Sequence, residues 1–119
     1  MSSIISIIIP THAEEKRIAE TLRDLTNFLA KNKLAYEIIV VDDGKDNTAE
    51  IVDGFAQKNK RISLMHFPKR LGKGKAIKEG LLKAHGDAII YDADASTPPH
   101  EIPKLLTALK DNDIAIGSR

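Results

Sequence analysis

Apolar residues along the chain follow two patterns that alternate. Short continuous apolar runs favour strands buried on both faces of a parallel sheet. Between these runs, apolar residues recur at helical spacing, so that Ile18, Leu22, Leu25 and Leu29 would share one face of a helix. The predicted strands are 4–9, 36–41, 61–67, 88–91 and 114–116. The predicted helices are 14–31, 48–57 and 73–84, with a further helix opened by Pro98-Pro99.

Strands that alternate with helices predict βαβ units with right-handed crossovers. We therefore expect an α/β fold, an open and mainly parallel sheet with flanking helices, with Pro10 stopping the first strand. In such sheets ligands bind outside the carboxyl ends of the strands. The candidate site consequently lies in the loops that follow Ile9, Val41, Phe67, Tyr91 and Ile116.

Composition indicates a single soluble domain and excludes several other classes of protein. The 119 residues, 42% hydrophobic and 29% charged, fit one soluble domain. A balance of 18 basic against 17 acidic residues gives no global attraction to nucleic acid. The absence of cysteine excludes a disulfide scaffold and a thiol nucleophile, and it fits a reducing, cytoplasmic setting. No signal-peptide pattern and no run of about 20 apolar residues occurs, so any membrane contact would be peripheral.

The loops after the first two predicted strands are acidic. Residues 10–15 carry Glu14 and Glu15, which a helix N-terminus also favours, and His12 alone is typical of a loop residue rather than a catalytic base or metal ligand. Asp42 and Asp43 end the second strand. Adjacent carboxylates repel each other unless something binds them, and they can accept hydrogen bonds from a nucleobase or a ribose. Capping of a turn is the structural alternative.

The next two loops carry complementary chemistry. Residues 69–75 concentrate basic side chains before a helix N-terminus, where phosphate is favoured, although a solvated basic loop is the simpler alternative. This loop is not a P-loop, because Ala76 stands where Ser or Thr would bind magnesium. Asp92-Ala93-Asp94 follows the fourth strand and could direct two carboxylates at Mg²⁺ or Mn²⁺. Such a short motif also arises by chance, but here it shares a sheet edge with the other loops.

Taken in order, these motifs resemble the N-terminal half of family 2 glycosyltransferases of the GT-A type. The resemblance covers essentially all 119 residues. Its motifs are Ile7-Ile8-Ile9-Pro10 with Glu14-Glu15, Ile39-Val40-Val41-Asp42-Asp43-Gly44, Arg70-Leu71-Gly72-Lys73-Gly74, Asp92-Ala93-Asp94 and Ile116-Gly117-Ser118-Arg119. The stretch 92–99 with Glu101-Ile102 is most similar to dolichyl-phosphate glucosyl- and mannosyltransferases.

The resemblance implies roles for individual residues. The implied substrate-binding residues are Pro10, Thr11, Glu14, Asp42, Asp43, Gly72, Lys73, Ala93 and Arg119. Of these, Asp42 and Asp43 would meet the base and ribose, and Arg119 would lie near the acceptor phosphate. The implied catalytic residues are Asp92, Asp94 and Lys73, with Asp92 and Asp94 as ligands of a divalent cation.

The implied reaction is inverting transfer of a hexose from a nucleoside-diphosphate sugar, UDP-glucose or GDP-mannose, to a polyprenyl phosphate. Such an acceptor is already anionic and needs little help from a general base. The sequence departs from the family pattern at two places, the first of which removes an amide that could order the loop and the second of which leaves the donor open. His12-Ala13 replaces an aromatic residue followed by Asn, and Ser96 stands where mannosyltransferases often have Gln, which favours the glucosyl type.

The family's acceptor-binding half would lie beyond Arg119, so we expect residues 1–119 to form a truncated, donor-binding unit. Such a unit would expose an edge of its sheet, so we expect a homodimer or a partner that covers this edge. Because the expected acceptor is a membrane lipid, we also expect the protein to act at the cytoplasmic face of a membrane. The main alternative is a nucleotide-sugar-binding module without catalysis. A phosphoacceptor signalling domain is disfavoured, because its acids would follow the first and third strands, whereas here they follow the second and fourth. A sugar nucleotidyltransferase is disfavoured as well, because Pro10-Thr11-His12 stands in place of its glycine-rich first loop.

Overall fold

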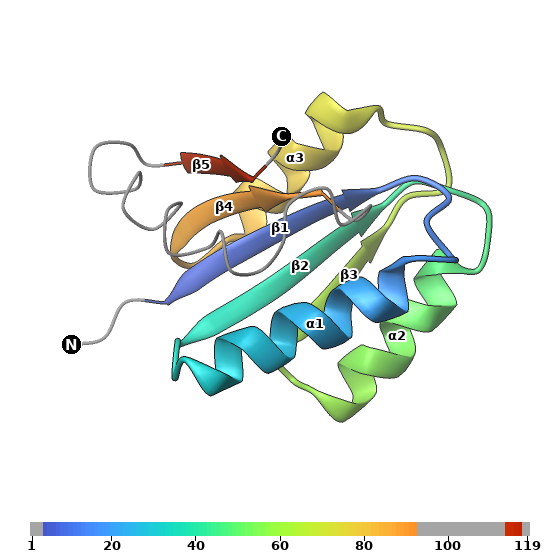
Figure 1. Cartoon of the computed structure of the whole chain (residues 1–119). Coiled ribbons are helices and arrows are strands. Elements are labelled where there is room, and N and C mark those ends of the chain that lie inside the picture. Colours follow the sequence, from blue (N-terminus) through green and yellow to red (C-terminus); the bar gives the residue numbers. More distant parts are fainter. Residues whose placement is uncertain (1–3, 93–113, 118–119) are drawn as a thin grey trace.

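The computed structural model describes residues 4–92 and the backbone of residues 114–117 (Figure 1). Its strands are β1 (Ile5–Thr11), β2 (Tyr36–Asp42), β3 (Ile62–His66), β4 (Asp87–Tyr91) and β5 (Ile114–Gly117). Its helices are α1 (Ile18–Lys31), α2 (Thr48–Lys58) and α3 (Lys73–Lys83). The predicted alternation of strands and helices is confirmed. The predicted helix after Pro98-Pro99, the motif residues Ala93 and Asp94, and Arg119 lie outside the described residues.

The strands that the structure describes form one parallel sheet in the order β3-β2-β1-β4-β5. From β1 the chain moves outward to β2 and β3, and then returns to place β4 on the other side of β1 (Figure 1). This reversal creates a topological switch point between β1 and β4. Crevices that bind ligands open at such points, outside the carboxyl ends of the strands.

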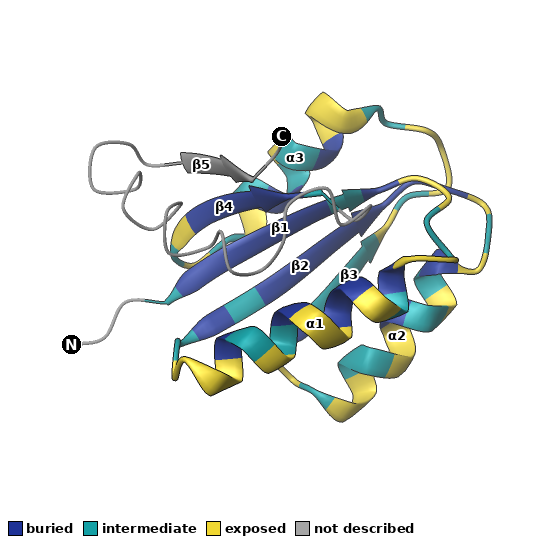
Figure 2. Cartoon of the chain, in the orientation of Figure 1, coloured by how far each residue is buried: buried dark blue, intermediate teal, exposed yellow. Residues whose placement is uncertain are grey.

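Helices cover both faces of the sheet, which explains the continuous apolar runs in the central strands. Ile7 and Ile9 of β1 pack in one core with the apolar stripe of α1, whereas Ile8 lies in a second core with α3. Figure 2 shows β1 and β2 buried along most of their length, between α1 and α2 on one face and α3 on the other. β3 and β5 form the edges of the described sheet.

Helix α3 lies unusually close to the sheet because of Gly80. A Cβ atom on Gly80 would lie 2.5 Å from Ile8 Cγ2 and 3.2 Å from Val41 Cγ2. Ala76 and Gly80 are accordingly the buried positions of the helix. The predicted apolar positions Ile77 and Leu81 are only partly buried, although they pack against the same core.

The prediction that Pro10 stops the first strand is wrong, because β1 continues to Thr11. Pairing of β1 with β4 ends at Ile8↔Ile90, while pairing with β2 continues to Thr11↔Asp42. The Thr11 carbonyl accepts a hydrogen bond from the β2 side, so the alternating backbone directs Pro10 toward the β4 side. The missing N–H of proline therefore falls beyond the last β1–β4 pair and costs no ladder bond.

The first helix also begins later than predicted, at Ile18 rather than residue 14. A turn precedes it, in which the Glu14 carbonyl accepts hydrogen bonds from the Arg17 and Ile18 N–H groups. The N–H groups of Glu14 and Glu15 donate instead to side chains at the start of α2. Every other predicted boundary within the described residues agrees with the structure to within one or two positions.

Candidate functional site

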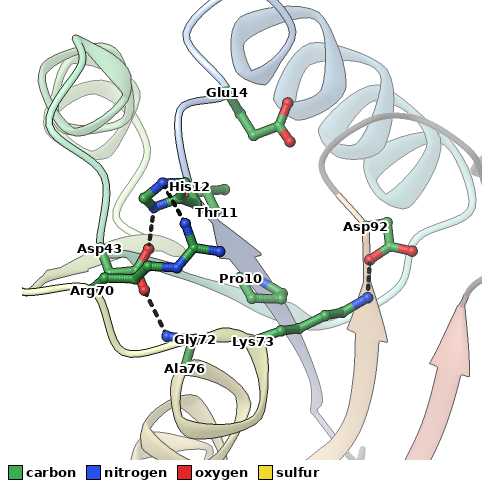
Figure 3. Close-up of a pocket in the computed structure, with 10 residues that line it drawn as sticks. All are labelled: Pro10, Thr11, His12, Glu14, Asp43, Arg70, Gly72, Lys73, Ala76 and Asp92. Atoms are coloured by element: carbon green, nitrogen blue, oxygen red, sulfur yellow. Dashed lines mark hydrogen bonds and ion pairs between the residues drawn. The ribbon is translucent and has the colours of Figure 1, made fainter.

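A cavity of about 260 Å³ lies at the switch point, where the carboxyl ends of β1 and β4 meet the loops after β2 and β3. Figure 3 shows the residues that line it. They are Pro10, Thr11, His12, Glu14, Asp43, Arg70, Gly72, Lys73, Ala76 and Asp92. The structure thus brings seven of the predicted site residues to one cavity, and it adds His12, Arg70 and Ala76.

Asp43 anchors the basic loop that follows β3. Its Oδ2 accepts hydrogen bonds from the Leu71 and Gly72 N–H groups, at 2.6 and 3.0 Å. Burial raises the pKa of this carboxyl, but the hydrogen bonds from His12, Leu71 and Gly72 outweigh burial, and the pKa is lowered overall. Within the predicted phosphate-binding loop, the Leu71 and Gly72 N–H groups are therefore already occupied by the Asp43 carboxylate. Gly72 has φ +84°, a conformation that favours glycine.

His12 links Asp43 to Arg70. Its Nδ1 lies 2.9 Å from Asp43 Oδ1, and its Nε2 lies 3.0 Å from Arg70 Nη1 (Figure 3). A guanidinium only donates hydrogen bonds, so Nε2 must be the acceptor and Nδ1 must carry the proton that is donated to Asp43. This geometry selects the neutral tautomer of His12. Sequence reasoning treated His12 as an ordinary loop residue, since neither partner is near it in the chain.

Asp42 lies behind the cavity rather than in its lining. The side chain is fully buried, and Oδ1 accepts a hydrogen bond from Thr11 Oγ1 at 2.7 Å. Its Oδ2 accepts from His66 Nδ1 at 3.1 Å. The two adjacent acids are thus separated in function by the alternation of the strand end: Asp43 reaches the cavity lining, whereas Asp42 ties β1 to β3 through β2.

The wall formed by the loop after β1 is fastened to the start of α2. Asp46 Oδ1 accepts hydrogen bonds from the N–H and hydroxyl of Thr48, and Asp46 Oδ2 accepts from the Glu15 N–H. In return, Glu15 Oε1 accepts from the Asn47 N–H at 2.9 Å. Asp46, rather than the cap residue Asn47, therefore satisfies the N–H group of the first helical residue, Thr48. The neighbouring Glu14 N–H donates to Thr48 Oγ1, and these contacts together hold Glu14 in the lining of the cavity.

Gly44 permits this approach of the two loops. A Cβ atom there would lie 2.7 Å from the Ala13 backbone nitrogen, and Ala13 itself has φ +59°. A side chain at residue 44 would push the loop after β1 away from the loop after β2. The glycine of the predicted Asp-Asp-Gly motif is thus required by packing.

Lys73 and Asp92 form the other side of the cavity. Lys73 Nζ lies 3.0 Å from Asp92 Oδ1 (Figure 3). Lys73 is 60% exposed and Asp92 is 21% exposed, so both groups remain accessible from the cavity. Asp92 directly follows Tyr91, a buried residue whose pKa burial raises to about 12, with the Asp24 charge adding to the shift. The buried ring fixes the end of β4 and hence the position of Asp92.

The predicted cation ligands are only partly within the described chain. Asp92 offers carboxylate oxygens at the cavity edge, and such hard ligands suit Mg²⁺ or Mn²⁺. Its predicted partner Asp94 lies outside the described residues. Within residues 4–92 and 114–117, no group of three or more His, Cys, Asp or Glu side chains is arranged to hold a metal ion. Asp92 fits the expected donor chemistry, and it would have to exchange Lys73 for the cation.

A family model described as "Glycosyl transferase family 2" matches residues 6–119. The chain belongs to this family. It is 38% identical to a dolichyl-phosphate beta-glucosyltransferase of Trichomonas vaginalis, with 96% of this chain and 38% of the relative aligned. It is 39% identical to a dolichol-phosphate mannosyltransferase of Pyrococcus furiosus, with 97% of this chain and 33% of the relative aligned. The chain thus spans between about a third and two fifths of the length of these relatives.

Solved structures support the same assignment. A mannosyltransferase from Pyrobaculum calidifontis in complex with GDP-Man and Mn²⁺ superimposes with a TM-score of 0.76. The two are 27% identical, and the alignment covers 94% of this chain and 34% of that structure. The fold is therefore that of GT-A glycosyltransferases, as the sequence predicted. In the described part of the chain, no helix is long and apolar enough to cross a membrane.

Proposed function

We propose that this chain binds the donor in an enzyme that transfers a hexose from a nucleoside-diphosphate sugar to a polyprenyl phosphate. The observation that carries the proposal is the cavity at the β1–β4 switch point, which combines the cations of Arg70 and Lys73 with the carboxylate of Asp92. Family membership and the names of the relatives support the same activity. A divalent cation is supported by the Mn²⁺ in the related mannosyltransferase.

The charges in the cavity suit a diphosphate. Lys73 Nζ at the start of α3 and the guanidinium of Arg70 supply positive charge beside a helix N-terminus. The cavity is slightly smaller than the roughly 300–1,000 Å³ of a pocket that encloses a small ligand. The described residues would therefore hold part of the donor, with Ala93, Asp94 and Arg119 as further proposed contacts.

The residues would divide the work as follows. Pro10, Thr11, Glu14 and Gly72 would shape the nucleotide pocket, Asp43 would meet the base or ribose, and Asp42 would hold Thr11 in place from behind. Lys73 would stabilise the negative charge that grows on the departing diphosphate. Asp92 and Asp94 would hold Mg²⁺ or Mn²⁺, which supplies charge neutralisation to the same leaving group. An anionic acceptor attacks without a strong general base, with inversion at the sugar carbon.

The decisive experiment is isothermal titration calorimetry of UDP-glucose and GDP-mannose, each with and without Mn²⁺. We expect one donor to bind in a metal-dependent manner, and we expect Asp94→Asn to weaken it by about tenfold or more. Asp87→Asn is the matched control, because Asp87 is an exposed carboxylate at the opposite end of β4. Binding of neither donor to the folded chain, or binding indifferent to both Mn²⁺ and Asp94→Asn, would contradict the proposal.

Transfer to the acceptor requires a separate assay. Labelled sugar should pass from the donor that binds to a polyprenyl phosphate in detergent or in vesicles. Donor binding by the complete protein without transfer would favour the alternative, a nucleotide-sugar-binding module. Contact with the membrane that carries the acceptor, and a homodimer through an edge of the sheet, remain proposals that vesicle sedimentation and light scattering test.

A further inference from the structure

His12 and Arg70 face each other at the edge of the cavity, with His12 Nε2 3.0 Å from Arg70 Nη1. We propose that His12 is a positioning residue for the donor: its neutral ring holds the Arg70 guanidinium over the cavity, and protonation of the ring releases it. This inference rests on the proposed function, because it concerns how the same cavity meets an anionic ligand. The inference predicts that the affinity for the donor depends on pH and that His12 causes this dependence.

The hydrogen bonds determine why the ring must be neutral. Arg70 Nη1 donates to His12 Nε2 at 3.0 Å, and this contact needs the lone pair on Nε2. A protonated ring has no such lone pair and carries a positive charge that repels the guanidinium. The bond of Nδ1 to Asp43 Oδ1, at 2.9 Å, survives in both forms, since Nδ1 is a donor in each. Protonation would therefore break one contact of the bridge and keep the other.

The side chain of Arg70 depends on His12 more than its backbone does. The neighbouring N–H groups of Leu71 and Gly72 are fixed by Asp43 Oδ2 without help from the imidazole. Arg70 itself is exposed, and the ordering of a long side chain costs rotamer entropy. With His12 as partner, that cost is met before the donor binds. One guanidinium N–H is used for the bridge, and the others remain for a phosphate oxygen.

Charged groups surround the ring on several elements. Asp43 from the loop after β2 and Arg70 from the loop after β3 contact it directly. Glu14, from the loop after β1 that also carries His12, lines the same cavity. Lys73 from α3 and Asp92 after β4 line it as well. His66 is a second titratable ring near the site, bonded to Asp42 behind the cavity. A test must therefore separate His12 from His66 and from the acids.

Two substitutions separate the two contacts of the imidazole. Asn at residue 12 reaches the position of Nδ1, so His12→Asn keeps a donor for Asp43 and removes the acceptor for Arg70. Gln reaches the position of Nε2, so His12→Gln keeps the acceptor for Arg70 and removes the donor for Asp43. His85→Gln is the control, because His85 is an exposed ring bonded to Glu37, a residue near the opposite ends of β1 and β2.

The test is calorimetric titration of the chain with the donor that binds, at about pH 8 and about pH 5, the range in which histidine changes charge. Wild type and His85→Gln should lose about tenfold in affinity at the lower pH. His12→Asn should be weak at both values and should cause no further loss in an Arg70→Ala background. His12→Gln should bind nearly as well as wild type at the higher pH, with the pH dependence removed. Thermal unfolding should show that all variants are folded.

Three results would overturn this inference while leaving the proposed function intact. Equal losses from His12→Asn and His12→Gln would mean that the ring acts through Asp43 or by packing. Additive losses from His12→Asn and Arg70→Ala would mean that the two residues act independently. A pH dependence that persists in His12→Gln would assign it to another group, such as His66. No donor binding by folded wild type would overturn the proposed function and this inference together, whereas the other results leave the proposed function intact.

Discussion

Lys73 Nζ lies 3.0 Å from Asp92 Oδ1, and this pair joins the first residue of α3 to the residue that follows β4. Both residues line the cavity at the switch point, and the pair forms one of its sides. Under the proposed function, this cation and this carboxylate would exchange each other for the diphosphate and its metal ion.

Replacement of Lys73 should affect binding far more than stability. An exposed ion pair contributes little to folding, so Lys73→Met should change the free energy of unfolding by less than about 1 kcal/mol in urea denaturation. The same variant should weaken donor binding by about tenfold, because it removes a charge beside the phosphate. Lys78→Met, exposed on the same helix, is the matched control and should leave both values unchanged. A large loss of stability in Lys73→Met would show that the pair is structural.

Acid should destabilise the fold through three carboxyls. The pKa values of Asp43, Asp46 and Glu37 are lowered because hydrogen bonds outweigh burial, which alone would raise them. A lowered folded-state pKa gives stability that is present above the unfolded value, about 4, and is lost as the pH falls through the folded value. The free energy of unfolding should therefore stay nearly constant from neutral pH to about pH 5 and fall below about pH 4.

Asp43→Asn isolates one of these contributions. At neutral pH it should lower the free energy of unfolding by about 1–3 kcal/mol, because a buried acceptor of three hydrogen bonds loses its charge. The curves of wild type and variant should converge in acid, where the wild-type carboxyl is protonated. Urea denaturation across the pH range measures both curves, with the exposed Asp53→Asn as control. Parallel curves would contradict the assignment to Asp43.

Two glycines within helices should respond to alanine in opposite directions. Gly80→Ala places a Cβ against Ile8 and Val41, so it should destabilise the fold by about 1–3 kcal/mol despite the better helix propensity of alanine. Gly54→Ala, in α2, meets no atom within 4 Å and should stabilise by about 0.5–1 kcal/mol. Thermal denaturation measures both. A stabilising Gly80→Ala would mean that α3 can lift from the sheet at little cost.

The sequence by itself determined the elements and the class of fold. Apolar runs such as residues 36–41 and the spacing of Ile18, Leu22 and Leu25 are local patterns, and burial of an apolar strand or helix face depends mainly on them. The resemblance to family 2 glycosyltransferases also came from motifs that lie in order along the chain. The family model that matches residues 6–119 confirms it.

Only the tertiary structure decided how the site residues are used. The continuation of β1 through Pro10 depends on where β4 stops pairing, and the late start of α1 depends on contacts with α2. Asp42 and Asp43 are neighbours in sequence, yet one is buried against Thr11 and the other holds the basic loop. His12 and Arg70 are 58 residues apart, and no local pattern links them. Parallel strands meet at one edge only after folding, so the partners of a strand-end side chain are set by topology rather than by its sequence neighbours.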